Sequence, residues 1–379
     1  MGFLFTLKYK LGMFPNYEKI STEWNQILEK KRTLDSLKDS DLIKEYIQLK
    51  KQFGGTVVST QNSETANLEQ ELKKLAKNKK VKKFLALGTE NIDDQPFEVI
   101  HYMELKATLE NVQKQAAEQT SDTADVDKNK YQQLLVSPEV KKYETLVTDP
   151  TLDYFNSNNI LLEESFEKNN DFNGSWALDP QYSEFSGGSY SQQDDFHCYC
   201  TDNVKVLNGI CDIALVKQQS QSKIWSPVMG FVPKTFDFTS GILRSKNAVQ
   251  ASKISIEVAA QFKPTNGIVH ALVLKDKKSG QMIDLFRSGK KGVGFGIPDG
   301  NGGKYTSLTC LDFGKKHVYR VDITSSQVVW YMNNQEVARQ NISASNAEWD
   351  MTALVAAKSQ NVPASNLKLD WVRVVDRLV

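Results

Sequence analysis

The sequence predicts a multidomain protein of α and β class, with an N-terminal helical repeat or bundle region followed by an antiparallel β-sandwich of the jelly-roll type. Three observations predict this. Residues 1–150 hold 46 of the 93 charged side chains, spaced as on amphipathic helices. Residues 151–379 hold five of the six Trp, 16 of the 21 Gly and all four Cys. Short alternating apolar runs, separated by Gly, Asn and Pro, follow residue 160.

The change of composition near residue 155 predicts two domains, a helical region at 1–155 and a β-sandwich at 156–379. The net charge of +1 argues against a nucleic-acid-binding protein, which commonly carries a basic excess. No apolar stretch reaches the roughly 18 residues that cross a bilayer, so no membrane span is expected.

The first residues, MGFLFTLKYKLG, lack the charge order and the length of a secretory signal, which predicts a cytoplasmic protein. Met1-Gly2 with Thr6 also matches a myristoylation pattern, so peripheral membrane association stays open. The alternative is an apolar start to the first helix, or a small buried anchor.

Four segments of the helical region share an aliphatic residue, an aromatic residue and a leucine at spacings of three. They are Ile43-Tyr46-Leu49, Val81-Phe84-Leu87, Val99-Tyr102-Leu105 and Val140-Tyr143-Leu146. On a helix this spacing gives one apolar face, which predicts core packing for the aromatic residues. The separations of 38, 18 and 41 residues are uneven, so the array is a degenerate repeat. Such helices must pack together or against another chain, which allows a homo-oligomer or a protein partner.

Local signals divide this region further. Ser137 and Pro138 predict a helix start, with Ser137 as the N-cap. Gly54-Gly55 and residues 91–95 predict interruptions, and residues 116–130 lack an apolar face, which predicts an exposed connector. His101 is predicted to be a packing or surface residue.

In the second region, residues 204–216 form two alternating apolar runs around Asn208-Gly209, the strongest short hairpin signal. Further runs predict strands at 253–262, 268–275, 282–286, 292–297, 317–324, 328–332 and 367–375. Many short strands without helical periodicity between them favour a sandwich or jelly roll.

We predict no cofactor and no metal. Gly292, Gly294 and Gly296 alternate in a strand and lead into a turn, not into the helix that a dinucleotide site requires, so they favour close backbone approach. The DGNGG run at 299–303 lacks the spaced carboxylates of a calcium loop. The four cysteines do not have zinc spacing and are expected to be free thiols: Cys198, Cys200, Cys211 and Cys310.

Five blocks occur in a familiar order: LLEESFEKNNDFNGSWAL, NVKVLNGICDIALVKQ, FDFTSGILRSKNAVQASKISIEVAAQF, HVYRVDITSSQVVWYMNNQEVAR and LKLDWVRVV. In this order they resemble the family 16 glycoside hydrolases, the laminarinase-like group with a concanavalin A-type jelly roll. The resemblance covers residues 161–379, and the helical region has no counterpart in it. It implies a sandwich with a carbohydrate cleft on its concave face.

In that family the chemistry depends on one strand, Glu-Ile-Asp-Ile-x-Glu, whose two Glu are nucleophile and general acid/base. A bulge brings the second Glu to the face of the first, because retaining hydrolysis needs two carboxyls about 5–5.5 Å apart. The matching residues are Met282 at the nucleophile, Asp284, and Arg287 at the acid/base. A thioether cannot form the glycosyl ester and a guanidinium stays protonated, so no catalytic residue is predicted and the domain is expected to be a pseudoenzyme.

The cleft differs from the family as well. A strand with two Trp in the family corresponds here to residues 269–273, which have none. Trp225 lies in residues 223–234, which we expect to be a loop crossing the concave face. The candidate ligand-binding residues are therefore Trp225, His270, Asp284 and Arg287.

Three functions remain open. The first is a non-catalytic, lectin-like or scaffold protein that binds an oligo- or polysaccharide. The second is a structural protein whose helical region drives oligomerisation or partner binding. The third is an active glycosidase on β-glucans with relocated carboxylates, for which Glu257 is a candidate.

Overall fold

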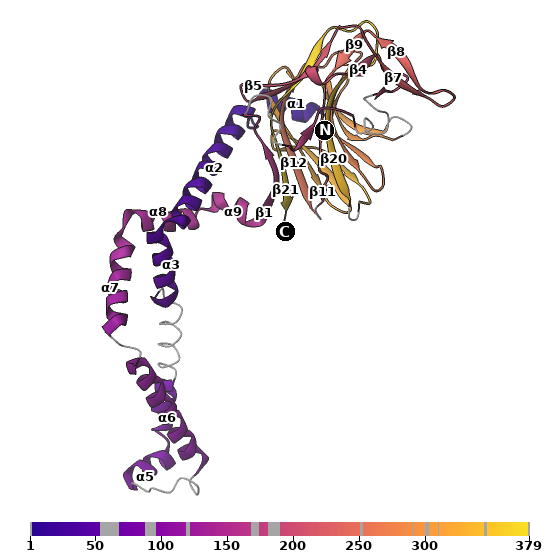
Figure 1. Ribbon diagram of the computed structural model, residues 1–379. Coiled ribbons are helices and arrows are strands. Elements are labelled where there is room, and N and C mark those ends of the chain that lie inside the picture. Colours follow the sequence, from indigo (N-terminus) through magenta and orange to yellow (C-terminus); the bar gives the residue numbers. More distant parts are fainter. Residues whose placement is uncertain are drawn as a thin grey trace. The chain divides into compact units, whose positions relative to one another are not determined.

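The computed structural model describes residues 2–53, 68–87, 96–118, 122–167, 174–180, 190–250, 253–290, 292–299, 303–309, 311–344 and 347–377. Gly54-Gly55, residues 91–95 and Cys310 lie outside these ranges. The chain forms two compact units, one made of Met1–Gln26 with Asp153–Val379 and one made of Ile27–Leu152. The first 26 residues thus belong to the unit that holds the strands (Figure 1).

Two mainly antiparallel sheets, both formed by described residues, build the sandwich unit and confirm the predicted fold class (Figure 1). The ten-stranded sheet has the order β19 (Gln335–Asn341), β18 (Gln327–Met332), β17 (His317–Ile323), β12 (Ile254–Phe262), β21 (Ser365–Arg377), β6 (Ile210–Val216), β9 (Phe238–Ser240) and β4 (His197–Tyr199). β1 (Asn158–Glu164) pairs with β21, and β5 (Val204–Leu207) pairs with β6.

The eight-stranded sheet has the order β16 (Lys304–Thr309), β15 (Gly292–Ile297), β14 (Met282–Ser288), β13 (Ile268–Asp276), β20 (Glu348–Ala357), β10 (Ile242–Ser245) and β2 (Trp176–Ala177). β11 (Val249–Gln250) pairs with β20. A small third sheet contains β3 (Tyr190–Ser191), β7 (Ser220–Ser226) and β8 (Gly230–Phe236).

The hydrophobic core lies between the two large sheets, because alternate residues of each strand face inward. Trp330 of β18 is fully buried and donates its indole N–H to the backbone oxygen of Asp284 in β14, at 2.8 Å. This bond joins the two sheets directly under the strand that the sequence singles out. Helix α1 (Gly2–Lys10) contributes Phe5 to the same core, as expected for a buried apolar anchor.

The predicted hairpin at Asn208-Gly209 is confirmed. Asn208 and Gly209 have φ of 53° and 73°, the left-handed conformation that a two-residue hairpin turn requires. The expectation of a loop at residues 223–234 is wrong. These residues form most of the hairpin β7–β8, in which Pro233 is paired with Lys223.

The helical unit and its flanks contain α2 (Tyr17–Asp39), α3 (Asp41–Phe53), a helix at 68–75, α5 (Lys79–Leu87), α6 (Phe97–Glu118), α7 (Asp122–Val136), α8 (Pro138–Val147), η1 (Pro150–Leu152) and α9 (Asp153–Ser157). The repeated pattern marks packed faces. In α3 and α8 its members are all buried, and Tyr46 of α3 contacts the rings of Tyr131 and Tyr143 at 5.9 and 6.3 Å.

Two local predictions need correction. Pro138 begins α8, but the side chain of Ser137 makes no capping hydrogen bond. Residues 116–118 and 122–130 are helical parts of α6 and α7, so the expected connector is helix wherever it is described. Among the described residues, no helix is long and apolar enough to cross a membrane.

Candidate functional site

The strand register aligns polar residues on the outer face of the eight-stranded sheet. Arg244 of β10 lies opposite Thr352 of β20, Thr352 lies opposite Val273 of β13, and Val273 lies opposite Asp284 of β14. Side chains that are paired across antiparallel strands point to the same face. A single row therefore runs from Arg244 to Asp284 across four strands.

The bulge that the family resemblance implies is present in β14. Leu272 pairs with Phe286 while Val273 pairs with Asp284, so Leu285 is the extra residue. Leu285 and Phe286 are both fully buried in the core. Because two successive residues face inward, Arg287 returns to the outer face that Met282 and Asp284 occupy.

Asp284 is fully buried and its carboxylate is saturated by two neighbours. Arg287 forms a bidentate ion pair with it, through Nε to Oδ2 and through Nη2 to Oδ1 at 3.1 Å. Tyr305 of β16 donates its hydroxyl to Oδ2 at 2.5 Å. Such charge-assisted bonds are the strong class of protein hydrogen bonds. The carboxylate is thus fixed as an acceptor.

These contacts perturb the two donors. Burial opposes the charge of Arg287, but its hydrogen bond with Asp284 and its attraction to that carboxylate outweigh burial and raise the pKa of the guanidinium. Burial and the hydrogen bond to Asp284 raise the pKa of the Tyr305 hydroxyl. Arg287 therefore stays protonated and Tyr305 stays a donor throughout the physiological range.

The alternating glycines of β15 allow this arrangement by close approach, as predicted. A Cβ on Gly296 would lie 2.1 Å from the backbone oxygen of Lys304, and one on Gly292 would lie 2.0 Å from that of Leu308. A Cβ on Gly294 would meet the ring of Tyr305 at 3.2 Å. The glycines let β16 sit against β15 so that Tyr305 reaches Asp284.

A pocket of about 250 Å³ opens beside this group on the same face. Its wall combines three cations, one carboxylate, two tyrosines, an amide and a hydroxyl with apolar residues. They are Arg244, Lys275, Arg287, Asp195, Tyr190, Tyr199, Gln192, Thr352, Pro180, Ile242, Val273, Met282 and Leu354. We call this cavity the outer-face pocket.

Asp195, the one carboxylate that lines the outer-face pocket, also has partners on both oxygens. It is 5% exposed, accepts a 2.6 Å ion pair from Lys358, and accepts the backbone N–H of Gln192 at 3.1 Å. These bonds hold the segment that carries Tyr190 and Gln192 against the sheet. The sequence patterns did not identify this wall, because residues far apart in the chain form it, as in the ion pair of Asp195 with Lys358.

Of the predicted ligand-binding residues, the structure pairs Asp284 with Arg287, of which only Arg287 lines the outer-face pocket, and it places His270 elsewhere. His270 is fully buried between the sheets, where Nδ1 lies 3.0 Å from the hydroxyl of Ser288 and Nε2 lies 2.8 Å from that of Ser365. Its ring stacks on Phe262 at 5.3 Å. Burial lowers the pKa of His270 to about 4. The expectation that His270 faces a ligand is wrong, because the side chain of His270 lies on the face of β13 that points into the core.

Trp225 lies near the tip of the β7–β8 hairpin and is 50% exposed. It is not among the residues that line the outer-face pocket. Its ring packs edge-on against Phe231 at 5.1 Å, and Phe231 packs edge-on against Tyr190 at the same distance. Because Tyr190 lines the pocket, an aromatic run leads from the pocket to Trp225.

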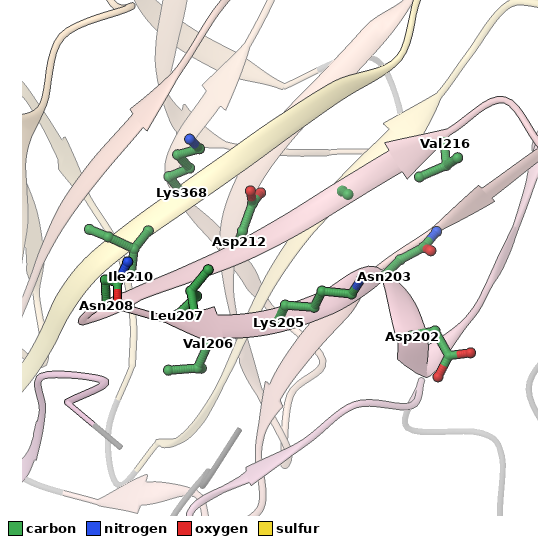
Figure 2. Close-up of a pocket in the computed structure, with 11 residues that line it drawn as sticks. Asp202, Asn203, Lys205, Val206, Leu207, Asn208, Ile210, Asp212, Val216 and Lys368 are labelled. Atoms are coloured by element: carbon green, nitrogen blue, oxygen red, sulfur yellow. The ribbon is translucent and has the colours of Figure 1, made fainter. Parts of the chain in front are cut away.

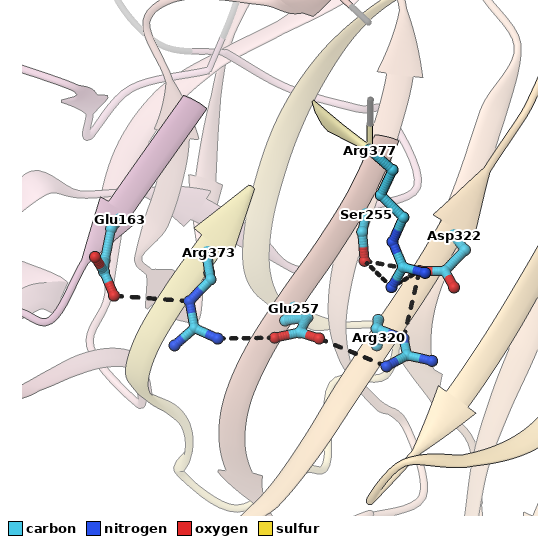
Figure 3. A network of polar contacts seen from close by, with 7 residues as sticks. All are labelled: Glu163, Ser255, Glu257, Arg320, Asp322, Arg373 and Arg377. Atoms are coloured by element: carbon cyan, nitrogen blue, oxygen red, sulfur yellow. Dashed lines mark hydrogen bonds and ion pairs between the residues drawn. The ribbon is translucent and has the colours of Figure 1, made fainter. Parts of the chain in front are cut away.

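Glu257 lies on the other sheet. In β12 it pairs in register with Arg373 on one side and Arg320 on the other, with ion pairs of 3.0 and 3.7 Å (Figure 3). Arg373 reaches Glu163 at 3.6 Å, so cations and anions alternate across the strands. The guanidinium of Arg373 also lies 3.4 Å from the ring centre of Trp24. Glu257 thus belongs to a structural ion network and does not face the outer-face pocket.

A second cavity of about 560 Å³ lies on the outer face of the ten-stranded sheet (Figure 2). Lys205, Asp212 and Lys368 face it from three adjacent strands, between the apolar side chains of Leu207 and Val216. None of the predicted ligand-binding residues lines it.

The described residues contain no group of three or more His, Cys, Asp or Glu side chains that could hold a metal ion. Cys198, Cys200 and Cys211 are free thiols. Burial raises the pKa of the Cys198 and Cys211 thiols, which lowers their reactivity.

Comparison with known proteins gives structural matches only. No protein-family model and no curated protein matches the sequence. Among solved structures, the chain is similar to the catalytic domain of an endo-1,3-beta-glucanase (laminarinase) from Thermotoga petrophila RKU-1, with 16% identity, a TM-score of 0.48, and coverage of 58% of this chain and 98% of that one.

It is also similar to an endo-beta-1,3-glucanase from Pyrococcus furiosus, with 16% identity, a TM-score of 0.47, and coverage of 58% and 94%. The kappa-carrageenase of Pseudoalteromonas carrageenovora matches with 13% identity, a TM-score of 0.45, and coverage of 58% and 95%. These matches are similarities only. The sandwich is defined by its own strand pairing.

Proposed function

We propose that the sandwich unit binds a carbohydrate in the outer-face pocket without hydrolysing it. One observation carries the proposal: the bulged strand β14 presents Met282, Asp284 and Arg287 on one face, and its single carboxylate is saturated by Arg287 and Tyr305. The strand therefore keeps the geometry of a glycosidase strand but not its pair of carboxyls.

The chemistry of these side chains argues against catalysis. Retaining hydrolysis needs a free carboxylate nucleophile and a protonated carboxyl about 5–5.5 Å away. Met282 offers neither, and Arg287 remains a cation. Asp195 accepts the ion pair of Lys358 and a backbone N–H, so it is engaged as well.

The wall of the outer-face pocket suits a hydroxylated ligand. Gln192, Thr352 and Arg287 offer amide, hydroxyl and guanidinium groups, and Tyr190 and Tyr199 add aromatic rings. A few polar groups among apolar walls are typical of ligand sites. At about 250 Å³ the cavity lies just below the usual range of about 300–1,000 Å³, so it suits one sugar unit of a longer chain.

The test has two arms. A glycan array with neutral and acidic glycans should give hits whose affinity, measured by calorimetry, falls about 2- to 12-fold in Thr352→Val, because a neutral hydrogen bond to the ligand contributes about 0.5–1.5 kcal/mol. Asn341→Ala, an exposed change at the end of β19, is the control.

In the second arm, the protein should release no reducing sugar from β-1,3- or β-1,4-glucans. Turnover that Asp284→Ala abolishes would overturn the non-catalytic proposal. Absence of any glycan hit would overturn carbohydrate binding itself.

A second candidate is assembly through the helical unit. It is favoured by the exposed valines of α7, since Val126 and Val136 are 65% and 67% exposed. Light scattering should then give a mass above 42.8 kDa that Val136→Lys reduces to the monomer. A monomeric wild-type protein excludes this candidate.

A further inference from the structure

The helical unit contains a dense group of positive charges, which is a separate feature from the site in the sandwich. Seven of the eleven residues from 73 to 83 are lysines: Lys73, Lys74, Lys77, Lys79, Lys80, Lys82 and Lys83. We call residues 73–83 the lysine-rich segment. It joins the helix at 68–75 to α5, and all seven lysines are exposed. This charge is local, since the whole chain has a net charge of only +1.

The structure leaves most of this charge uncompensated. In the part of the chain that the structure describes, Lys80 pairs with Glu98 of α6 at 2.9 Å, and it is the one lysine of the segment with an ion pair. Glu69 and Glu71 are the acidic residues within five positions of the segment in the sequence, and Glu90, Asp93 and Asp94 follow within eleven. Like charges this dense repel one another, which costs stability unless an anionic partner is present.

The helix geometry separates the lysines from the packed face. In α5, Val81 is fully buried and Phe84 is half-buried, and this side packs against α6. Lys79, Lys82 and Lys83 are three or four residues apart and share the opposite face. These three lysines therefore take no part in the packing of α5 on α6 and point to solvent.

Large apolar side chains are exposed beside this charge. Phe97 begins α6, next to the Glu98 that pairs with Lys80, and is 75% exposed. Leu85, two residues after Lys83, is 51% exposed. Cations with exposed apolar side chains at their edge are the combination by which helices lie on anionic lipid surfaces.

We propose that the lysine-rich segment, with Leu85 and Phe97, docks on an anionic lipid bilayer. The lysines supply attraction to the negative surface, and the two apolar side chains enter the headgroup region. The composition favours lipid over nucleic acid, because arginine is the residue that recognises phosphates and bases bidentately. No arginine lies between Arg32 and Arg244.

The test is co-sedimentation of the full chain with vesicles of phosphatidylcholine alone, or of an equimolar mixture with phosphatidylserine. We expect binding to the mixed vesicles only. Each lysine near an anionic surface contributes about a fivefold change in partition. Lys82→Gln/Lys83→Gln should therefore weaken binding about 25-fold, and Phe97→Ser should weaken it at every salt concentration.

The chain provides a matched control. Val140-Lys141-Lys142-Tyr143 of α8 repeats the local pattern Val81-Lys82-Lys83-Phe84, and Lys141 and Lys142 are also exposed. Lys141→Gln/Lys142→Gln removes the same charge outside the segment and should leave binding unchanged. Equal loss in both double variants, equal binding to neutral vesicles, no binding to phosphatidylserine, or displacement from the vesicles by duplex DNA would each overturn the proposal.

Discussion

The hydroxyl of Tyr305 donates a 2.5 Å hydrogen bond to Asp284, whose carboxylate is fully buried. Asp284 of β14 and Tyr305 of β16 both pair in register with Gly296 of β15, the strand between them. The bond explains how a lone acid persists on the outer face of the sheet. Arg287 pairs with the Asp284 carboxylate there, and the Tyr305 hydroxyl gives it a further donor.

Removal of this hydroxyl should destabilise the sandwich. Tyr305→Phe deletes one donor to a buried carboxylate, which costs about 1.5–3 kcal/mol of unfolding free energy. Urea denaturation measures this change. Tyr331→Phe, on the exposed side of β18, should change the unfolding free energy by less than about 0.5 kcal/mol. Equal effects of the two changes would show that Tyr305 acts through ring packing alone.

His270 should make the sandwich less stable in acid. Its folded pKa of about 4 lies below the ordinary value of 6.5, so the unfolded chain binds the proton more readily. The contribution is complete above pH 6.5 and is lost as the pH falls towards 4, in total about 3 kcal/mol. His270→Gln should flatten the dependence of unfolding free energy on pH between these values. An unchanged slope would contradict the buried neutral imidazole.

The sequence allowed much of the sandwich to be predicted, because local signals act in both of its large sheets. Asn208-Gly209 determines its turn by backbone conformation, and the motif at 282–287 implied a bulge that the register of β14 contains. The orientation of His270 was predicted wrongly, because the alternation along β13 does not show which of its two faces points inward. The wall with Asp195 was missed because it depends on contacts between residues 163 positions apart, such as Asp195 with Lys358.

The close approach of β15 and β16 should make Gly296 intolerant of any side chain. A Cβ there would lie 2.1 Å from the backbone oxygen of Lys304, so Gly296→Ala must push the strands apart. Overpacking of this kind costs about 1–3 kcal/mol, and here it also moves Tyr305 from Asp284. Gly289→Ala is the control, because nothing lies within 4 Å of its Cβ position. Thermal unfolding should separate the two variants clearly, and equal midpoints would contradict the close approach.

The ion network of the ten-stranded sheet predicts a structural role for Glu257. Glu257→Gln leaves Arg373, whose side chain is 5% exposed, with Glu163 as its remaining anionic partner in the network. Breaking a largely buried pair costs several kcal/mol, and partial exposure reduces this to about 2 kcal/mol. Glu336→Gln breaks an exposed pair with Arg339 and should cost about 0–1 kcal/mol. Loss of glycan binding in Glu257→Gln without loss of stability would instead place Glu257 in a ligand site.

The aromatic run from the outer-face pocket predicts a dependence on ligand length. Tyr190 lines the pocket, whereas Trp225 is connected to it only through Phe231. A short sugar that fills the pocket should therefore lose affinity in Tyr190→Ala but not in Trp225→Ala. A longer chain should lose affinity in both, by about 2- to 12-fold for each ring, because an aromatic contact adds about 0.5–1.5 kcal/mol. Calorimetry with a disaccharide and a hexasaccharide of the same linkage measures the difference. Equal loss for both ligands in Trp225→Ala would mean that the hairpin folds over the pocket on binding, and no loss for either would confine the site to the pocket.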